Sequence, residues 1–191
     1  MQTPSSNLIF ILVAAMEGGL LLVAAIWIYL AHIPLLKSMH FNWHVCLIGL
    51  LVALGTTGFS LLTLTLGKAI PLLRELRKMS AEVLAPLIEN LGPIDIALIS
   101  LVSGFCEEVL FRGVVQSQIG LLPTSLFFGL FHDPTLKQKS YVLFTMIAGL
   151  ILGYLYQKTG NLWASISAHI FHNFFALLLL RYVIRLKKEP E

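Results

Sequence analysis

The sequence predicts an all-α protein, a polytopic transmembrane helical bundle of about six membrane segments plus one amphipathic interfacial helix. Of its 191 residues, 57% are hydrophobic and 12% are charged, whereas charged residues make up about 25% of soluble domains. Apolar stretches of about 20 residues, the length that crosses a ~30 Å hydrocarbon core, recur along the chain. The net charge of +3 is small and scattered, which argues against a nucleic-acid partner.

The first part of the chain contains two of these apolar segments, residues 8–31 and 45–66. The first lacks the basic start and the small-residue cleavage site of a signal peptide, so we expect it to remain as a membrane helix. In the second segment, Gly49, Gly55 and Gly58 form a face of small residues suited to close helix packing.

Glu17 is an acidic residue in the middle of the first segment, next to Gly18 and Gly19. A charged group inside a membrane helix is costly and often marks a functional site. Two interpretations stand. Glu17 either faces a central cavity, or it is a protonated residue that hydrogen-bonds to a neighbouring helix which the two glycines allow to come close.

A segment of mixed character, residues 68–90, connects the two halves of the sequence. Charged and apolar residues are interleaved there at roughly helical spacing, with Pro71 near the start and Pro86 as an interruption. We expect this segment to lie along the membrane surface. It completes an N-terminal two-span region, residues 1–92.

The second region, residues 93–186, contains four more apolar segments and is followed by a basic and acidic tail at 187–191. One of these segments is short and ends at Asp133 and Pro134, because the residue before a proline disfavours the helical conformation. Gly149 and Gly153 have the spacing of a helix-packing motif. The four segments are residues 94–118, 121–132, 141–156 and 162–184.

Lys and Arg are unevenly distributed between the two ends of the segments. If six segments cross the membrane and the N-terminus is cytoplasmic, ten of these residues fall on the cytoplasmic side, and only Lys37 and Lys158 fall on the other, with Arg112 excluded as intramembrane. Cytoplasmic loops carry an excess of basic residues, so we expect both termini in the cytoplasm. The ten are Lys68, Arg74, Arg77, Lys78, Lys137, Lys139, Arg181, Arg185, Lys187 and Lys188.

Three charged side chains interrupt the segment 94–118. Glu108 and Arg112 are four residues apart, so they share a helix face and can neutralise each other. Glu107 is rotated by about 100° from Glu108 and has no partner in its own helix. One carboxylate is therefore expected to be structural, and the carboxylate of Glu107 is expected to be free for chemistry.

Polar residues of two other segments reach the depth of Glu107. At a rise of 1.5 Å per residue, Glu107 lies about 20 Å along its helix, and His169 lies about 10 Å along the last helix from the opposite side. His132 lies about 16 Å along the short segment, and Asn173 shares a helix face with His169. We therefore expect a carboxylate, two imidazoles and a carboxamide at one depth in the membrane.

This set of groups is suited to the hydrolysis of a carbonyl compound. A carboxylate and a neutral imidazole can take the proton of a water that attacks a carbonyl carbon. An imidazole N–H and a carboxamide N–H can stabilise the oxyanion that forms. Two alternatives remain open: Glu107, His132 and His169 could hold a zinc ion with an open fourth position, or the polar residues could only join the helices.

The residues resemble three motifs of the CAAX-protease and bacteriocin-processing family, the Rce1-like intramembrane proteases. Flanking sequences such as Phe111-Arg112-Gly113 and Thr159-Gly-Asn-Leu-Trp163 are also similar, and the resemblance covers about residues 96–177. The three motifs are Glu107-Glu108-x-x-x-Arg112, Phe128-x-x-x-His132 and His169-x-x-x-Asn173.

The resemblance implies a role for each motif residue. Glu107 matches the catalytic glutamate, and His132 matches the histidine that activates water with it. The oxyanion-stabilising pair corresponds to His169 and Asn173. The supporting pair of the first motif corresponds to Glu108 and Arg112, and His172, which is not a motif position, receives no catalytic role.

The resemblance also implies the class of reaction and the location. The better-understood members of this family look like metal-free glutamate peptidases. We therefore expect no cofactor, with zinc as the alternative. We expect an intramembrane endopeptidase of a bacterial plasma membrane or an organelle membrane. Its expected partners are membrane lipids and a membrane-associated peptide, which could carry a lipid at a CAAX-type C-terminus. The opposing hypothesis is a non-catalytic membrane scaffold or a bacteriocin self-immunity protein.

Overall fold

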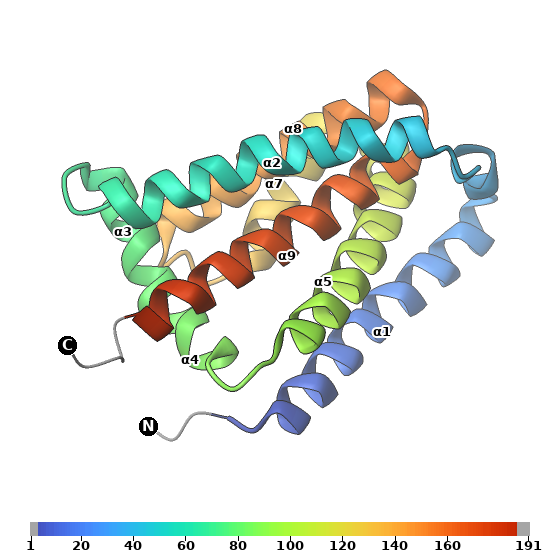
Figure 1. Ribbon diagram of the computed structural model, residues 1–191. Helices are drawn as coiled ribbons and strands as arrows, with labels where there is room; N and C mark the ends of the chain where they lie inside the picture. Colours follow the sequence, from blue (N-terminus) through green and yellow to red (C-terminus); the bar gives the residue numbers. More distant parts are fainter. Residues whose placement is uncertain (1–3, 187–191) are drawn as a thin grey trace.

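The computed structural model describes residues 4–186, and within this range it consists of helices and connecting turns without a strand (Figure 1). The prediction of an all-α bundle is confirmed. Four described helices are long and apolar enough to cross a membrane, so the chain is a membrane protein. They are α1 (Ser6–Ala31), α2 (Trp43–Leu66), α8 (Lys139–Thr159) and α9 (Leu162–Leu186). The expected tail at 187–191 lies outside the described residues.

The expected span at 94–118 is a helix with an irregular middle. α5 (Pro93–Glu108), the π-helical η3 (Val109–Val115) and α6 (Gln116–Ile119) follow one another without a break. The wider turn η3 begins directly after Glu108, and such turns are frequent at functional sites. α7 (Leu121–His132) has 12 residues and is about 18 Å long, which is less than the thickness of the hydrocarbon core.

The connector between the two halves is also a continuous helical segment. It consists of α3 (Pro71–Met79), the π-helical η2 (Ser80–Leu84) and α4 (Ala85–Ile88). The expected interruption at Pro86 is therefore wrong. Proline lacks an N–H donor and crowds the preceding turn, and the wider turn η2, which comes directly before α4, accommodates this within the helix.

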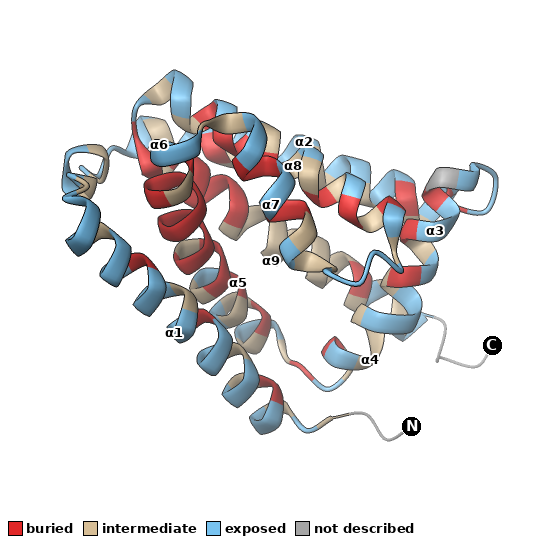
Figure 2. Cartoon of the chain, turned by 180° about the vertical axis from the view of Figure 1, so that it is seen from behind, coloured by how far each residue is buried: buried red, intermediate tan, exposed pale blue. Residues whose placement is uncertain are grey.

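α1 packs on the rest of the bundle through a narrow stripe of residues. Its buried residues are Ile9, Glu17 and Ala24, about two turns apart, and most of its remaining surface is exposed (Figure 2). A Cβ atom on Gly18 or Gly19 would have nothing within 4 Å. The expected close helix contact at these glycines is therefore wrong, and neither carboxyl oxygen of Glu17 has a direct hydrogen-bond partner among the described residues.

The predicted glycine contacts are only partly present. A Cβ atom on Gly49 would lie 2.5 Å from the carbonyl oxygen of Ala164 in α9, so α2 and α9 depend on this glycine to pack closely. Gly55 and Gly58 have nothing within 4 Å of such an atom, and Gly55 borders a cavity. The prediction of a small-residue packing face on α2 is therefore confirmed at Gly49 and wrong at Gly55 and Gly58.

Candidate active site

The close approach of α5 and α9 positions the first functional residues. A Cβ atom on Gly104 would lie 2.7 Å from Cγ1 of Ile170, so the two helices can be this close only because residue 104 has no side chain. One turn further along α5, Glu108 faces α9, and its Oε1 lies 2.9 Å from Nδ1 of His169.

Glu108, Arg112 and His169 form a buried charged cluster. Nη1 of Arg112 donates to Oε1 of Glu108 at 2.6 Å, which is the pairing that the four-residue spacing predicts. Nη2 of Arg112 donates to the carbonyl oxygen of Gly149 at 3.2 Å. The guanidinium also lies over the ring of Phe128, 4.2 Å from its centroid. Glu108 therefore connects three helical elements, and its link to His169 was not foreseen from the sequence.

Glu107 and His132 face each other from α5 and α7. Nε2 of His132 lies 3.7 Å from Oε2 of Glu107, which is too far for a hydrogen bond. The other ring nitrogen, Nδ1, is 2.8 Å from the carbonyl oxygen of Phe128 and must donate to it, because a carbonyl oxygen only accepts. In the neutral imidazole, Nε2 is then an acceptor that faces a second acceptor, the Glu107 carboxylate.

Phe128 has a role beyond its place in the sequence motif. Its carbonyl fixes the tautomer of His132, and its ring contacts the rings of His132 and His169, with centroids 4.6 and 5.9 Å apart respectively. The spacing Phe128-x-x-x-His132 could have predicted the contact between the Phe128 carbonyl and the His132 ring, because the carbonyl of residue i−4 lies next to the side chain of residue i in a helix.

Asn173 lies on α9 one turn after His169. Its Nδ2 donates to the hydroxyl of Ser103 at 3.2 Å, which leaves its second amide hydrogen available. His172 is bound elsewhere: its Nδ1 lies 2.9 Å from Oγ1 of Thr56 in α2. This contact of His172 is thus with α2 and not with a motif residue, although His172 lines the same cavity as His132, His169 and Asn173.

A cavity of about 600 Å³ adjoins these residues. His132, His169 and Asn173 line it on one side, and its remaining wall comes mainly from apolar residues of α2, α3, α8 and α9. Tyr141 of α8 also lines it and packs edge-on against His132, with ring centroids 6.0 Å apart. A mainly apolar cavity with a few polar groups at one side is the usual form of a small-molecule or peptide site.

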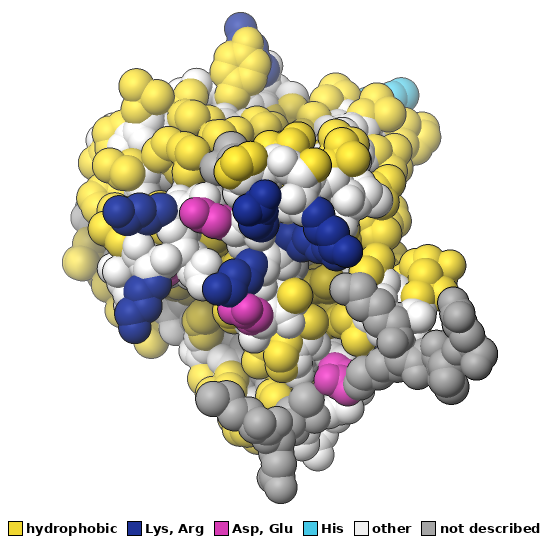
Figure 3. Space-filling model, turned by 90° about the vertical axis from the view of Figure 1, so that its left-hand side faces the viewer, with side chains coloured by type: hydrophobic (Ala, Val, Ile, Leu, Met, Phe, Trp, Pro, Cys, Tyr) yellow, Lys and Arg dark blue, Asp and Glu magenta, His cyan; other side chains and the backbone are white. Residues whose placement is uncertain are grey.

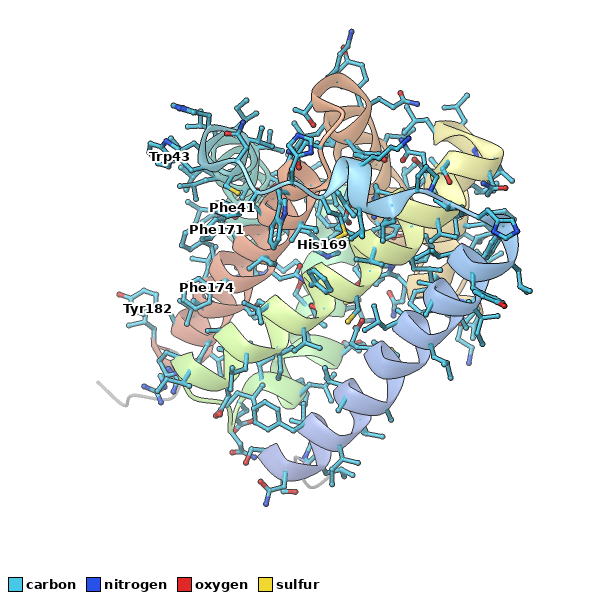
Figure 4. All side chains as sticks on the ribbon, turned by 90° about the vertical axis from the view of Figure 1, so that its right-hand side faces the viewer. Phe41, Trp43, His169, Phe171, Phe174 and Tyr182 are labelled. Atoms are coloured by element: carbon cyan, nitrogen blue, oxygen red, sulfur yellow. The ribbon has the colours of Figure 1, made fainter. Side chains whose placement is uncertain are left out.

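The positions of two labelled residues in Figure 4 illustrate the difference between the two faces of α9. His169 lies in the interior of the bundle and is 6% exposed, whereas Tyr182 points outward and is 61% exposed. The polar residues of the candidate site are thus directed away from the lipid-facing surface of this helix.

Within residues 4–186, no three His, Cys, Asp or Glu side chains are arranged to hold a metal ion. In the expected zinc set, Glu107 and His132 face each other, and Nδ1 of His169 contacts Glu108, which leaves Nε2 as the ring nitrogen of His169 without that contact.

Comparison with known proteins gives a match for the second half of the chain. Residues 89–175 match the family described as type II CAAX prenyl endopeptidase Rce1-like. The uncharacterized protein YpbD of Bacillus subtilis (strain 168) is 41% identical over 76 residues, which span 39% of this chain and 39% of YpbD. No solved structure matches the chain.

Proposed function

We propose, from the match of residues 89–175 to the Rce1-like family, that the protein is an intramembrane endopeptidase whose water nucleophile is activated by Glu107 and His132. The observation that carries this proposal is the pair of facing acceptors, Oε2 of Glu107 and Nε2 of His132, 3.7 Å apart beside a cavity. One water can donate a hydrogen to each and keep a lone pair free to attack a carbonyl carbon.

Proton transfer follows from the same arrangement. As the water attacks, its proton passes to Glu107, and Glu107 then gives this proton to the nitrogen of the leaving amine when the C–N bond breaks. His132 orients the water through Nε2, while its Nδ1–H remains bonded to Phe128. General base catalysis of this kind contributes about 10²–10⁴-fold to a rate.

His169 and Asn173 are proposed to stabilise the oxyanion of the tetrahedral intermediate. Asn173 has one free amide hydrogen for this purpose. His169 already donates from Nδ1 to Glu108, so it can donate from Nε2 only when the ring is a cation. The Glu108 carboxylate favours that cation, and Arg112 balances the charge of Glu108, which gives the supporting pair of the motif a physical role.

The proposed substrate is a membrane-associated peptide, of CAAX type or with another C-terminus, and the cavity beside the site is suited to its apolar portion. We propose that the reaction needs no metal. Metal analysis of the purified protein tests this, because about one zinc per chain would overturn it.

The deciding experiment compares new peptide termini in membranes of cells that express wild type or Glu107→Gln at equal levels. Termini that appear only with wild type would establish proteolysis and identify the substrate. Glu82→Gln serves as control, because the Glu82 side chain is 60% exposed and forms a surface pair with Lys78. If wild type and a folded Glu107→Gln variant give identical termini, the scaffold hypothesis replaces the protease.

A further inference from the structure

Glu17 of α1 is a buried carboxyl group that the proposed mechanism does not use. It is 0% exposed, and neither carboxyl oxygen has a hydrogen-bond partner among the described residues. Buried polar groups are usually paired, so an exception in a native structure calls for an explanation. A carboxylate without a counter-ion in a membrane helix is especially costly, which favours the neutral acid at this position.

The packing of α1 places Glu17 beside the reactive part of α5. Ile9 belongs to the same apolar cluster as Ile96, and Ala24 belongs to the same cluster as Val109. The two helices thus run in the same direction, and Glu17, midway between Ile9 and Ala24, lies at the level of the turn before Glu107.

The electrostatic surroundings of Glu17 agree with that position. The carboxyl group of Glu17 lies within electrostatic range of Glu107 on α5 and of His169 on α9. The thiol of Cys106 lies within the same range of Glu17 and Glu107. These groups come from the elements that meet at the candidate site. Glu17 therefore belongs to the same buried polar region as the proposed base, although it comes from the other half of the chain.

No hydrogen bond among the described residues holds Oε2 of Glu107 in place. Its Oε2 is buried without a hydrogen-bond partner among the described residues, and its contact with His132 at 3.7 Å is longer than a hydrogen bond. A general base must be held in a defined orientation to be effective. A neutral carboxylic acid is a hydrogen-bond donor, and a carboxylate is an acceptor.

We propose that Glu17 is a positioning residue of the active site, which in its neutral form donates a hydrogen bond to the Glu107 carboxylate through one water. This inference rests on the proposed function of Glu107. It gives α1, which lies outside the segment that matches the family, a part in the chemistry.

The test uses Glu17→Met, Glu17→Gln and Ser100→Ala in the full-length protein. The probe is an internally quenched peptide that ends in a farnesylated CAAX sequence, and wild type and Glu107→Gln are measured alongside. We expect Glu17→Met to lower kcat at least about tenfold with little change in KM, because the orientation of the base is lost. Its midpoint temperature of unfolding in detergent should fall only slightly, because the lost hydrogen bond is offset by removal of the cost of burying the Glu17 carboxyl group.

The conservative variant separates positioning from simple packing. A carboxamide also donates a hydrogen bond, so Glu17→Gln should keep the rate within about threefold of wild type. Ser100→Ala removes another buried, unpartnered polar group of α5 and should leave both kcat and stability unchanged. The proposal is wrong if Glu17→Met is fully active, if Glu17→Gln is as impaired as Glu17→Met, or if Glu17→Met is markedly less stable.

A second measurement does not depend on catalysis. The variants Glu17→Met, Glu107→Met and the double variant form a cycle of unfolding temperatures. Shifts that do not add indicate that the two side chains interact, and additive shifts overturn the proposed hydrogen bond. If wild type cleaves no peptide, the proposed function fails, and this cycle still decides whether Glu17 and Glu107 are partners.

Discussion

The Oε1 atom of Glu108 accepts hydrogen bonds from both Arg112 and His169, at 2.6 and 2.9 Å. This one oxygen therefore serves stability, through the pair with Arg112, and the proposed chemistry, through the orientation of His169. The pair with Arg112 follows from the sequence, because the residues are four apart on one helix. The contact with His169 does not, because it joins residues 61 positions apart and depends on how α5 and α9 pack.

A double variant can separate the two roles of Glu108. Glu108→Met alone leaves Arg112 buried and unpaired, and we expect it to destabilise the protein by about 3–5 kcal/mol. Glu108→Met with Arg112→Met removes both charges and should recover most of that stability. Activity should not recover, because His169 has still lost its acceptor. Unfolding in detergent and peptide cleavage measure the two effects.

The chain provides a matched control for this prediction. Lys78 and Glu82 form a pair with the same four-residue spacing, but at 3.9 Å and with side chains that are 69% and 60% exposed. Glu82→Met should cost less than about 0.5 kcal/mol, because surface pairs contribute little. A loss in Glu108→Met no larger than in Glu82→Met would contradict the structural role of the buried pair.

At the scale of helices, the contact at Gly104 determines whether Glu108 can reach His169. We expect Gly104→Val to force α5 and α9 apart, since even a Cβ atom would lie 2.7 Å from Ile170. The hydrogen bond between Glu108 and His169 should then break, and cleavage of the peptide probe should fall at least about tenfold. Gly58→Val is the control, because nothing lies within 4 Å of a Cβ atom there. Equal activity of the two variants would show that the contact is not needed.

The loop after α7 gives a prediction about pH. Asp133 accepts hydrogen bonds from the hydroxyl and N–H of Thr135 and from the N–H of Gln138, at 2.5, 3.1 and 2.7 Å. These bonds, the hydroxyl of Thr135 first, hold the pKa of Asp133 below its ordinary value. Because the folded pKa is lowered, the loop gains stability above the ordinary Asp pKa and loses it as the pH falls through the lowered pKa.

Asp133 should therefore not cause any pH dependence between about pH 5 and 8, because it remains ionised there. We expect Asp133→Ala to increase hydrogen exchange at the amide of Gln138 across this range. In wild type, exchange corrected for its intrinsic pH dependence should increase only in acid, below the ordinary pKa of Asp. Protection that changes near neutral pH in wild type would mean that another group controls the loop.

How far the sequence predicts these elements depends on the range of the interactions involved. The long apolar helices and the end of α7 at His132 follow from local composition and from Pro134. The lipid-exposed glycine pair 18–19 and the irregular turns η2 and η3 do not, because neighbouring helices decide which face is covered. The same limit applies to Glu17, whose position opposite α5 follows from tertiary packing alone.

At the scale of the whole molecule, the arrangement of helix ends supports an orientation that is still a prediction. The first residues of α1 and α5 and the last residues of α2 and α9 lie toward the same end of the bundle (Figure 1). Lys and Arg side chains gather on the side of the molecule where α2 meets α3 (Figure 3). Basic residues favour the cytoplasmic side, so this end is expected to face the cytoplasm.

Labelling with a membrane-impermeant maleimide tests this orientation. Lys137→Cys and Lys158→Cys, each in a background with Cys46 and Cys106 replaced by Ala, place one thiol at either end of α8. We expect Lys158→Cys to react in intact cells and Lys137→Cys to react only after permeabilisation. The reverse pattern would invert the topology. Because the residue 137 loop follows His132 by five positions along the chain, the same result identifies the membrane side on which α7 ends beside the candidate site.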